Sequence, residues 1–181
     1  MSRVILVGGG VRCGKSRFAL EVARAEPGPR AFVATAGIAD DEMRERARRH
    51  RLERADAFET LEVPLDLRGA LSRLDAHAVV VDCLTLWLSN LLLRGDRPDA
   101  ILTETEAVCA FLASRTRLCV LVTNEVGMGI VPETPLGRAF RDLAGAAHQR
   151  FARAASEVYF GALGLLLRLK PGTVASVQVT R

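Results

Sequence analysis

Residues 9–16 read GGVRCGKS, a glycine-rich stretch of the type G-x-x-x-x-G-K-[ST]. It follows the apolar run RVILV and leads directly into SRFALEVARA, whose apolar spacing is that of a helix. In such a strand–loop–helix, backbone N–H groups and the helix N-terminus surround phosphates, while the lysine and serine reach the outer phosphates and Mg²⁺. A glycine-rich turn that matches by chance is the alternative. We therefore predict a nucleoside triphosphate site formed by Gly9, Gly10, Val11, Arg12, Cys13, Gly14, Lys15 and Ser16.

Polar residues follow two of the apolar runs. Asp82 ends the run AVVVD and resembles the aspartate that holds Mg²⁺ beside a phosphate loop, although it could instead cap the next helix. Asn124 and Glu125 follow the run LCVLVT. Ligands of open α/β sheets bind at this carboxyl edge of the strands. The sequence thus predicts Ser16 and Asp82 as metal ligands and leaves Asn124 and Glu125 either catalytic or capping.

The stretch RARRHRLER surrounds one histidine with five arginines. On a helix, Arg46, His50 and Arg54 fall on one face. Nearby guanidinium groups keep an imidazole neutral and bind phosphates, which suits attack of His50 on a phosphorus atom. The alternatives are a solvated basic face or arginines that only contact phosphate. Surface or packing roles are expected of the other two histidines, His77 and His148.

Runs rich in valine and isoleucine alternate with helical patterns along the chain. Strands are predicted at 3–7, 31–36, 78–82, 118–123 and 157–161, and helices at 15–26, 40–54, 84–94, 99–114 and 134–155. This alternation indicates an α/β fold with a mainly parallel sheet and helices on both faces. The connection before LLLRLK (165–170) is short, so we predict an antiparallel C-terminal edge strand there. A length of 181 residues predicts a single nucleotide-binding domain, 1–181.

Composition excludes several classes of protein. The apolar runs near the two ends are too short to span a bilayer or to serve as a secretory signal, so we expect a cytoplasmic protein. The four cysteines form no C-x-x-C pair, which argues against disulfides and structural zinc. A net charge of +4 suits either nucleic acid or a nucleotide, but an aromatic content of 5% is low for a surface that stacks single-stranded bases. We expect no nucleic-acid partner.

Five stretches together resemble a known family along nearly the whole chain: GGVRCGKS (9–16), ATAGIADDEM (34–43), RRHRLER (48–54), VVVDCLTLWLSNLL (79–92) and VTNEVGMGIVPETPLGRAFRDLAGAAHQR (122–150). The family is the bifunctional adenosylcobinamide kinase / adenosylcobinamide-phosphate guanylyltransferase of cobalamin biosynthesis. The chain departs from the family pattern after the histidine, where Ala55 replaces a usual proline and Phe58 a usual tryptophan, and in the long helix, where His148 replaces a frequent asparagine.

The resemblance implies a RecA-like P-loop fold, a homotrimer, Mg²⁺ as cofactor, and GTP and ATP as substrates. It implies that the hydroxyl of adenosylcobinamide is phosphorylated first. GTP then guanylylates His50 with release of pyrophosphate, and GMP passes to adenosylcobinamide phosphate to give adenosylcobinamide-GDP. The family's nucleotide contacts beyond the loop would map to Ala34, Thr35, Ala36, Arg51, Leu52, Glu53, Arg54, Glu62 and Asp82.

Three alternatives remain, the first from the resemblance and the other two from the residues. The chain could retain the guanylyl transfer alone, or it could be a simple small-molecule kinase in which His50 only contacts phosphate. A RecA-like ATPase that binds nucleic acid through the basic helix is the third, and the low aromatic content counts against it.

Overall fold

The computed structural model describes residues 3–36, 57–172 and 175–178. The predicted helix 40–54, with His50 and its arginines, lies outside the described residues. In chain order the elements are β1 (Arg3–Gly9), α1 (Lys15–Arg24), β2 (Arg30–Ala34), β3 (Glu59–Glu62), α3 (Leu67–Arg73), β4 (Ala78–Asp82), α4 (Leu84–Arg94), α5 (Pro98–Ser114), β5 (Leu118–Val122), α6 (Pro135–Ala154), β6 (Glu157–Ala162), β7 (Leu165–Lys170) and β8 (Ala175–Gln178).

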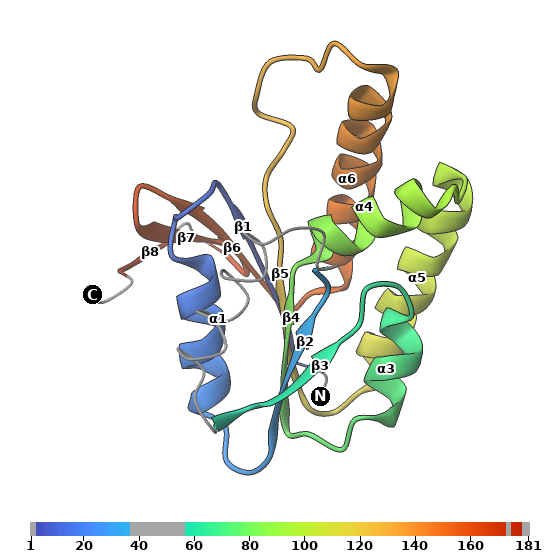
Figure 1. The fold of residues 1–181 in the computed structure, drawn as a ribbon. Helices are drawn as coiled ribbons and strands as arrows, with labels where there is room; N and C mark the ends of the chain where they lie inside the picture. Colours follow the sequence, from blue (N-terminus) through green and yellow to red (C-terminus); the bar gives the residue numbers. More distant parts are fainter. Residues whose placement is uncertain (1–2, 37–56, 173–174, 179–181) are drawn as a thin grey trace.

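The strands form one eight-stranded sheet in the order β3-β2-β4-β5-β1-β6-β7-β8 (Figure 1). The pairings from β3 through β6 are all parallel. β7 pairs antiparallel with β6, and β8 pairs antiparallel with β7. The prediction of a mainly parallel sheet with an antiparallel C-terminal strand is therefore confirmed, except that β8 rather than β7 is the outermost strand.

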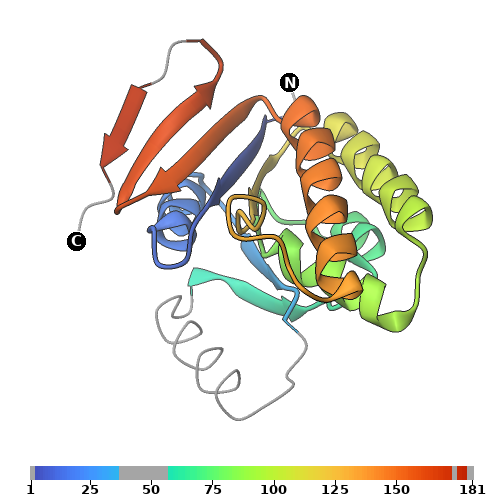
Figure 2. The ribbon, with the colours of Figure 1, turned by 90° about the horizontal axis from the view of Figure 1, so that it is seen from above.

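Helices cover both faces of the sheet, as Figure 2 shows from above: α1 lies on one face, and α3, α4, α5 and α6 lie on the other. Side chains alternate between the faces along each strand, because successive residues of a strand point to opposite sides. In β1, Val4 and Leu6 pack under α3–α6, whereas Ile5 and Val7 pack under α1. The sheet thus separates two clusters of buried apolar side chains.

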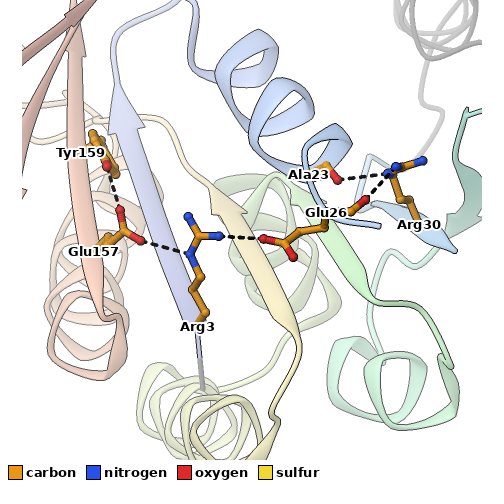
Figure 3. A network of polar contacts seen from close by, with 6 residues as sticks. All are labelled: Arg3, Ala23, Glu26, Arg30, Glu157 and Tyr159. Carbon is orange, nitrogen blue, oxygen red and sulfur yellow. Dashed lines mark hydrogen bonds and ion pairs between the residues drawn. The ribbon is translucent and has the colours of Figure 1, made fainter. Parts of the chain in front are cut away.

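A polar network connects the amino-terminal ends of β1 and β6 to the end of α1 (Figure 3). Arg3 donates to Glu26 beyond α1 at 2.7 Å and to Glu157 of β6 at 3.3 Å. Tyr159 donates to Glu157 at 2.7 Å, and Arg30 donates to three backbone carbonyls at the end of α1. These bonds fix the edge of the sheet opposite the phosphate loop.

All four cysteines carry free thiols. Cys119 is fully buried in β5, and burial raises its pKa to about 12, so it behaves as a small apolar side chain. Within the described part of the chain, no helix combines the length and the apolar character needed to cross a membrane.

Candidate nucleotide site

The glycine-rich loop joins the end of β1 to the first turn of α1. Gly14, with φ of 93°, immediately precedes the helix, and Lys15 and Ser16 form the helix start. Lys15 is 7% exposed, and its Nζ donates to the carbonyl of Gly10 at 2.8 Å. The loop therefore folds back over its own lysine, as a phosphate-binding loop requires.

Glycine at position 9 is required by contact with a neighbouring strand. A Cβ atom on Gly9 would lie 2.3 Å from the carbonyl oxygen of Gly161 in β6. A Cβ on Gly161 would in turn lie 2.6 Å from the sulfur of Cys13, which is 4% exposed. Two facing glycines thus let the loop pack onto β6, and Cys13 fills the space beneath it.

One row of the sheet brings together three of the residues expected to contact nucleotide. Glu62 of β3 pairs with Ala34 of β2, Ala34 pairs with Asp82 of β4, and Asp82 pairs with Val122 of β5. The same row continues to Val7 of β1, two residues before the loop begins. Because neighbouring strands lie about 5 Å apart, Asp82 and the loop share the carboxyl edge with one strand between them. The structure thus gathers Glu62, Ala34 and Asp82 at the edge where such sheets bind ligands.

Thr35 has every polar group engaged by the protein. The side chain is fully buried, and its hydroxyl donates to the carbonyl of Cys83 at 2.6 Å and accepts from the amide of Cys83 at 2.8 Å. Its own amide donates to the carbonyl of Asp82, and its carbonyl accepts from the side chain of Asn90. The geometry indicates that Thr35 supports the end of β4 and offers a ligand no unsatisfied group.

The two residues after Thr123 also make bonds within the protein. The side-chain amide of Asn124 donates to the hydroxyl of Thr85 at 3.0 Å, and the carboxylate of Glu125 accepts from the amide of Gly127 at 2.5 Å. The backbone amide of Glu125 donates to the carbonyl of Gly9 at 3.0 Å. This segment therefore braces the loop, and neither side chain caps a helix, because α6 begins only at Pro135 and has Thr134 as its cap.

Thr85 and Asn90 were missed by sequence reasoning. Both lie on α4, a helix that is otherwise largely apolar, and both bond to the carboxyl edge. The sequence did offer a signal for them: they are isolated polar residues in an apolar helix that directly follows the end of a strand. Beside them, burial and the charge of Asp82 raise the pKa of Cys83, so its thiol stays protonated at neutral pH.

The loop and the strand ends together form a candidate triphosphate site with an adjacent carboxylate. Ser16 and Asp82 offer oxygen ligands, the type that Mg²⁺ prefers. Among the described residues there is no group of three or more histidine, cysteine or acidic side chains that could hold a metal ion by itself. A P-loop magnesium site needs no such group, because phosphate oxygens supply further ligands.

Comparison with known proteins agrees with this geometry. The Bifunctional adenosylcobalamin biosynthesis protein CobP of Pseudomonas aeruginosa is 42% identical over 91% of this chain and 96% of its own length. The corresponding CobU proteins of Escherichia coli and Salmonella typhimurium are 39% and 38% identical, each over 92% of this chain and 99% of their own length.

Among solved structures, the flagellar accessory protein FlaH from Methanocaldococcus jannaschii aligns with a TM-score of 0.56 at 12% identity, covering 99% of this chain and 86% of that one. This likeness concerns the fold alone and agrees with the predicted RecA-like P-loop architecture. A family model described as cobinamide kinase / cobinamide phosphate guanyltransferase matches residues 5–169. The chain therefore belongs to the cobinamide kinase / cobinamide phosphate guanyltransferase family.

Proposed function

We propose that this protein carries out both reactions of its family at the carboxyl edge of the sheet, and that in the second reaction His50 carries GMP from GTP to adenosylcobinamide phosphate. The protein is a bifunctional cobinamide kinase and guanylyltransferase of cobalamin biosynthesis, with nucleotide and corrinoid substrates. The observation that carries the proposal is the phosphate loop beside the row Glu62–Ala34–Asp82, in a chain whose bifunctional relatives align over nine-tenths of its length.

In the kinase step, the hydroxyl of adenosylcobinamide attacks the γ-phosphorus of ATP or GTP, and the nucleoside diphosphate leaves. The loop amides and Lys15 hold the phosphates and stabilise charge on their oxygens. In the second step, a neutral imidazole nitrogen of His50 attacks the α-phosphorus of GTP, and pyrophosphate leaves. A phosphate oxygen of adenosylcobinamide phosphate then attacks the same phosphorus, which releases the imidazole and forms adenosylcobinamide-GDP.

Mg²⁺ is the proposed cofactor, held by Ser16 and Asp82. Bound there, it would neutralise charge on the phosphate oxygens. The proposed contacts beyond the loop are Ala34, Ala36, Glu62, Asp82 and the stretch 51–54, which lies outside the described residues. For Thr35 we propose support of the strand end in place of direct contact. Four free thiols agree with a reducing compartment, and we place the reaction in the cytoplasm.

We propose a homotrimer as the working assembly. The segment between β5 and α6 projects beyond the sheet (Figure 1) and presents large apolar side chains to solvent, with Met128 79% and Ile130 97% exposed. Exposed apolar groups of this size are typical of interaction surfaces. Light scattering should give a mass near three times the 19.6 kDa of the chain, and a monomeric mass at working concentration would contradict the trimer.

The histidine intermediate has a direct test. Incubation with Mg²⁺ and GTP labelled on the α-phosphate should place acid-labile, base-stable label on the wild-type chain. His50→Ala should carry none, because no other imidazole is proposed to attack the nucleotide. His77→Ala is the matched control and should label fully, since His77 is exposed and precedes β4 at the opposite edge of the sheet. An unlabelled wild type, or a labelled His50→Ala, would refute the intermediate.

A further inference from the structure

A half-buried histidine on α6 contacts the end of β5. The Nε2 atom of His148 lies 2.7 Å from the hydroxyl oxygen of Thr123, the first residue after the strand. Thr123 is 3% exposed. A ring nitrogen and a hydroxyl at this distance are hydrogen-bonded. Side chains therefore join the middle of α6 to the carboxyl edge of the sheet.

Thr123 in turn contacts the residues that lead into the phosphate loop. Its amide donates to the carbonyl of Val7 at 3.0 Å, and its methyl group lies 3.4 Å from where a Cβ on Gly8 would be. Two residues later, the amide of Glu125 donates to the carbonyl of Gly9 at 3.0 Å. Residues 123–125 thus run alongside the entry to the loop and hold it from one side.

We propose that His148 is a positioning residue for the nucleotide site: its neutral imidazole, bonded to Thr123, holds residues 123–125 against the start of the phosphate loop. The inference rests on nucleotide binding at that loop, which is part of the proposed function. It is independent of both group-transfer reactions. His148 touches neither substrate nor metal in this arrangement and acts through Thr123.

The neutral form of the imidazole is the one that fits this environment. Burial lowers the pKa of His148 below 6.5, and the charge of Glu125 opposes that shift. An imidazolium has two donors and no acceptor, and burying its charge without a full partner is unfavourable. Charged groups on the elements packed against α6 pair with other residues. On α5, Glu104 pairs with Arg68 of α3, Glu106 pairs with Arg150 of α6 itself, and Asp99 lies 3.9 Å from Arg97. Near the end of α4, Arg94 pairs with Asp96, and at the start of β1, Arg3 pairs with Glu26 and Glu157.

Protonation therefore loosens the support of the loop. We expect nucleotide affinity to fall as the pH drops below 6.5, in addition to any change that comes from titration of the nucleotide itself. A variant without a titrating group at position 148 should lack this added loss. Comparison of variants at each pH removes the contribution of the nucleotide, because that contribution is common to all of them.

The test measures the dissociation constant of a fluorescent GTP analogue with Mg²⁺ in a His50→Ala background, where the proposed nucleophile no longer titrates. His148→Ala should bind about 2- to 30-fold more weakly at pH 7.5, the range found for residues that act on a site indirectly. His148→Gln should bind within twofold of its parent, because the glutamine amide reaches the position of Nε2 without titrating. Its affinity should fall less than that of the parent between pH 7.5 and pH 5.5.

Phe151→Leu is the matched control on the same helix. Phe151 is fully buried in the cluster under α3–α6, so this change destabilises the fold without touching Thr123. It should leave the dissociation constant within twofold. The inference is overturned if His148→Ala binds like its parent, if Phe151→Leu weakens binding equally, or if His148→Gln loses affinity on acidification as its parent does. A parent that binds no nucleotide would contradict the proposed function itself.

Discussion

At the scale of single residues, the carboxyl edge is held by hydroxyl groups that the sequence motifs do not single out. The loop motif and Asp82 are recognisable in the sequence because their residue types and spacing follow directly from phosphate and metal chemistry. The role of Thr35 is different, because its partner Cys83 is 48 residues away and the bond exists only once β2 and β4 pair. The resemblance predicted Thr35 as a nucleotide contact; the structure places it at the carboxyl edge, with its bonds directed to the protein itself.

Thr35→Val is expected to lower the free energy of unfolding by about 1–3 kcal/mol, the usual effect of leaving a buried donor unsatisfied. The valine keeps the shape but cannot accept from the amide of Cys83, whereas the carbonyl of Cys83 retains the amide of Trp87. Thr35→Ser should recover most of the loss. Thr103→Val is the matched control: Thr103 is exposed on α5, so a change within about 0.5 kcal/mol is expected. Equal urea midpoints for Thr35→Val and Thr103→Val would contradict this account.

At the scale of elements, long apolar patterns were predictable and short polar ones were not. β1, β4 and β5 are visible as valine-rich runs, β6 as the short apolar run EVYFG, and the 20-residue α6 as one apolar stripe. β3 (ETLE) and β8 (ASVQ) have four residues each, too few for a periodic signal. The seven-residue α3 depends on Asp66, whose carboxylate accepts from the amide of Gly69. These elements form because the finished sheet and its neighbours offer them partners.

The end of α6 is held by a side chain from β7. The Nζ atom of Lys170 donates to the carbonyls of Ala152, Arg153 and Ala155, at 3.1, 3.0 and 2.5 Å. A cation at a helix C-terminus satisfies carbonyls that lack helical partners and interacts favourably with the helix dipole. The lysine therefore links the antiparallel end of the sheet to the helix that carries His148.

Lys170→Met is expected to lower the free energy of unfolding by about 1–3 kcal/mol, because it retains the apolar stem but removes the charged donor. Arg97→Met removes the same charge at a solvated position, where Arg97 and Asp99 lie 3.9 Å apart with side chains 86% and 89% exposed. Exposed pairs of this kind contribute little, so the control should change stability by less than about 0.5 kcal/mol. The measurement is thermal unfolding of the two variants and the wild type in parallel, which compares the stability lost in each variant. A similar shift in both would show that net charge, and not the capping of α6, is responsible.

At the scale of the whole molecule, the chain has one tryptophan and one tyrosine, and they report on opposite faces of the sheet. Trp87 is fully buried in the cluster under α3–α6, and its indole donates to the carbonyl of Leu65 at 2.7 Å. Tyr159 is 8% exposed in the cluster under α1, with its ring 4.8 Å from that of Phe18. Because every strand between β2 and β6 belongs to the same sheet, neither face can lose its packing while the other keeps it.

We therefore expect residues 1–181 to unfold as one cooperative domain. Tryptophan fluorescence, tyrosine absorbance and far-ultraviolet circular dichroism should give coincident urea transitions, the behaviour of a single cooperative unit. If the chain associates, the common midpoint should rise with protein concentration by mass action, but the probes should still coincide at each concentration. A tyrosine transition separated from the tryptophan transition would divide the chain into two units. The phosphate loop would then belong with α1 and β6, apart from the helices that carry Asn90 and His148, and the proposed coupling of α6 to the nucleotide site would lose its structural basis.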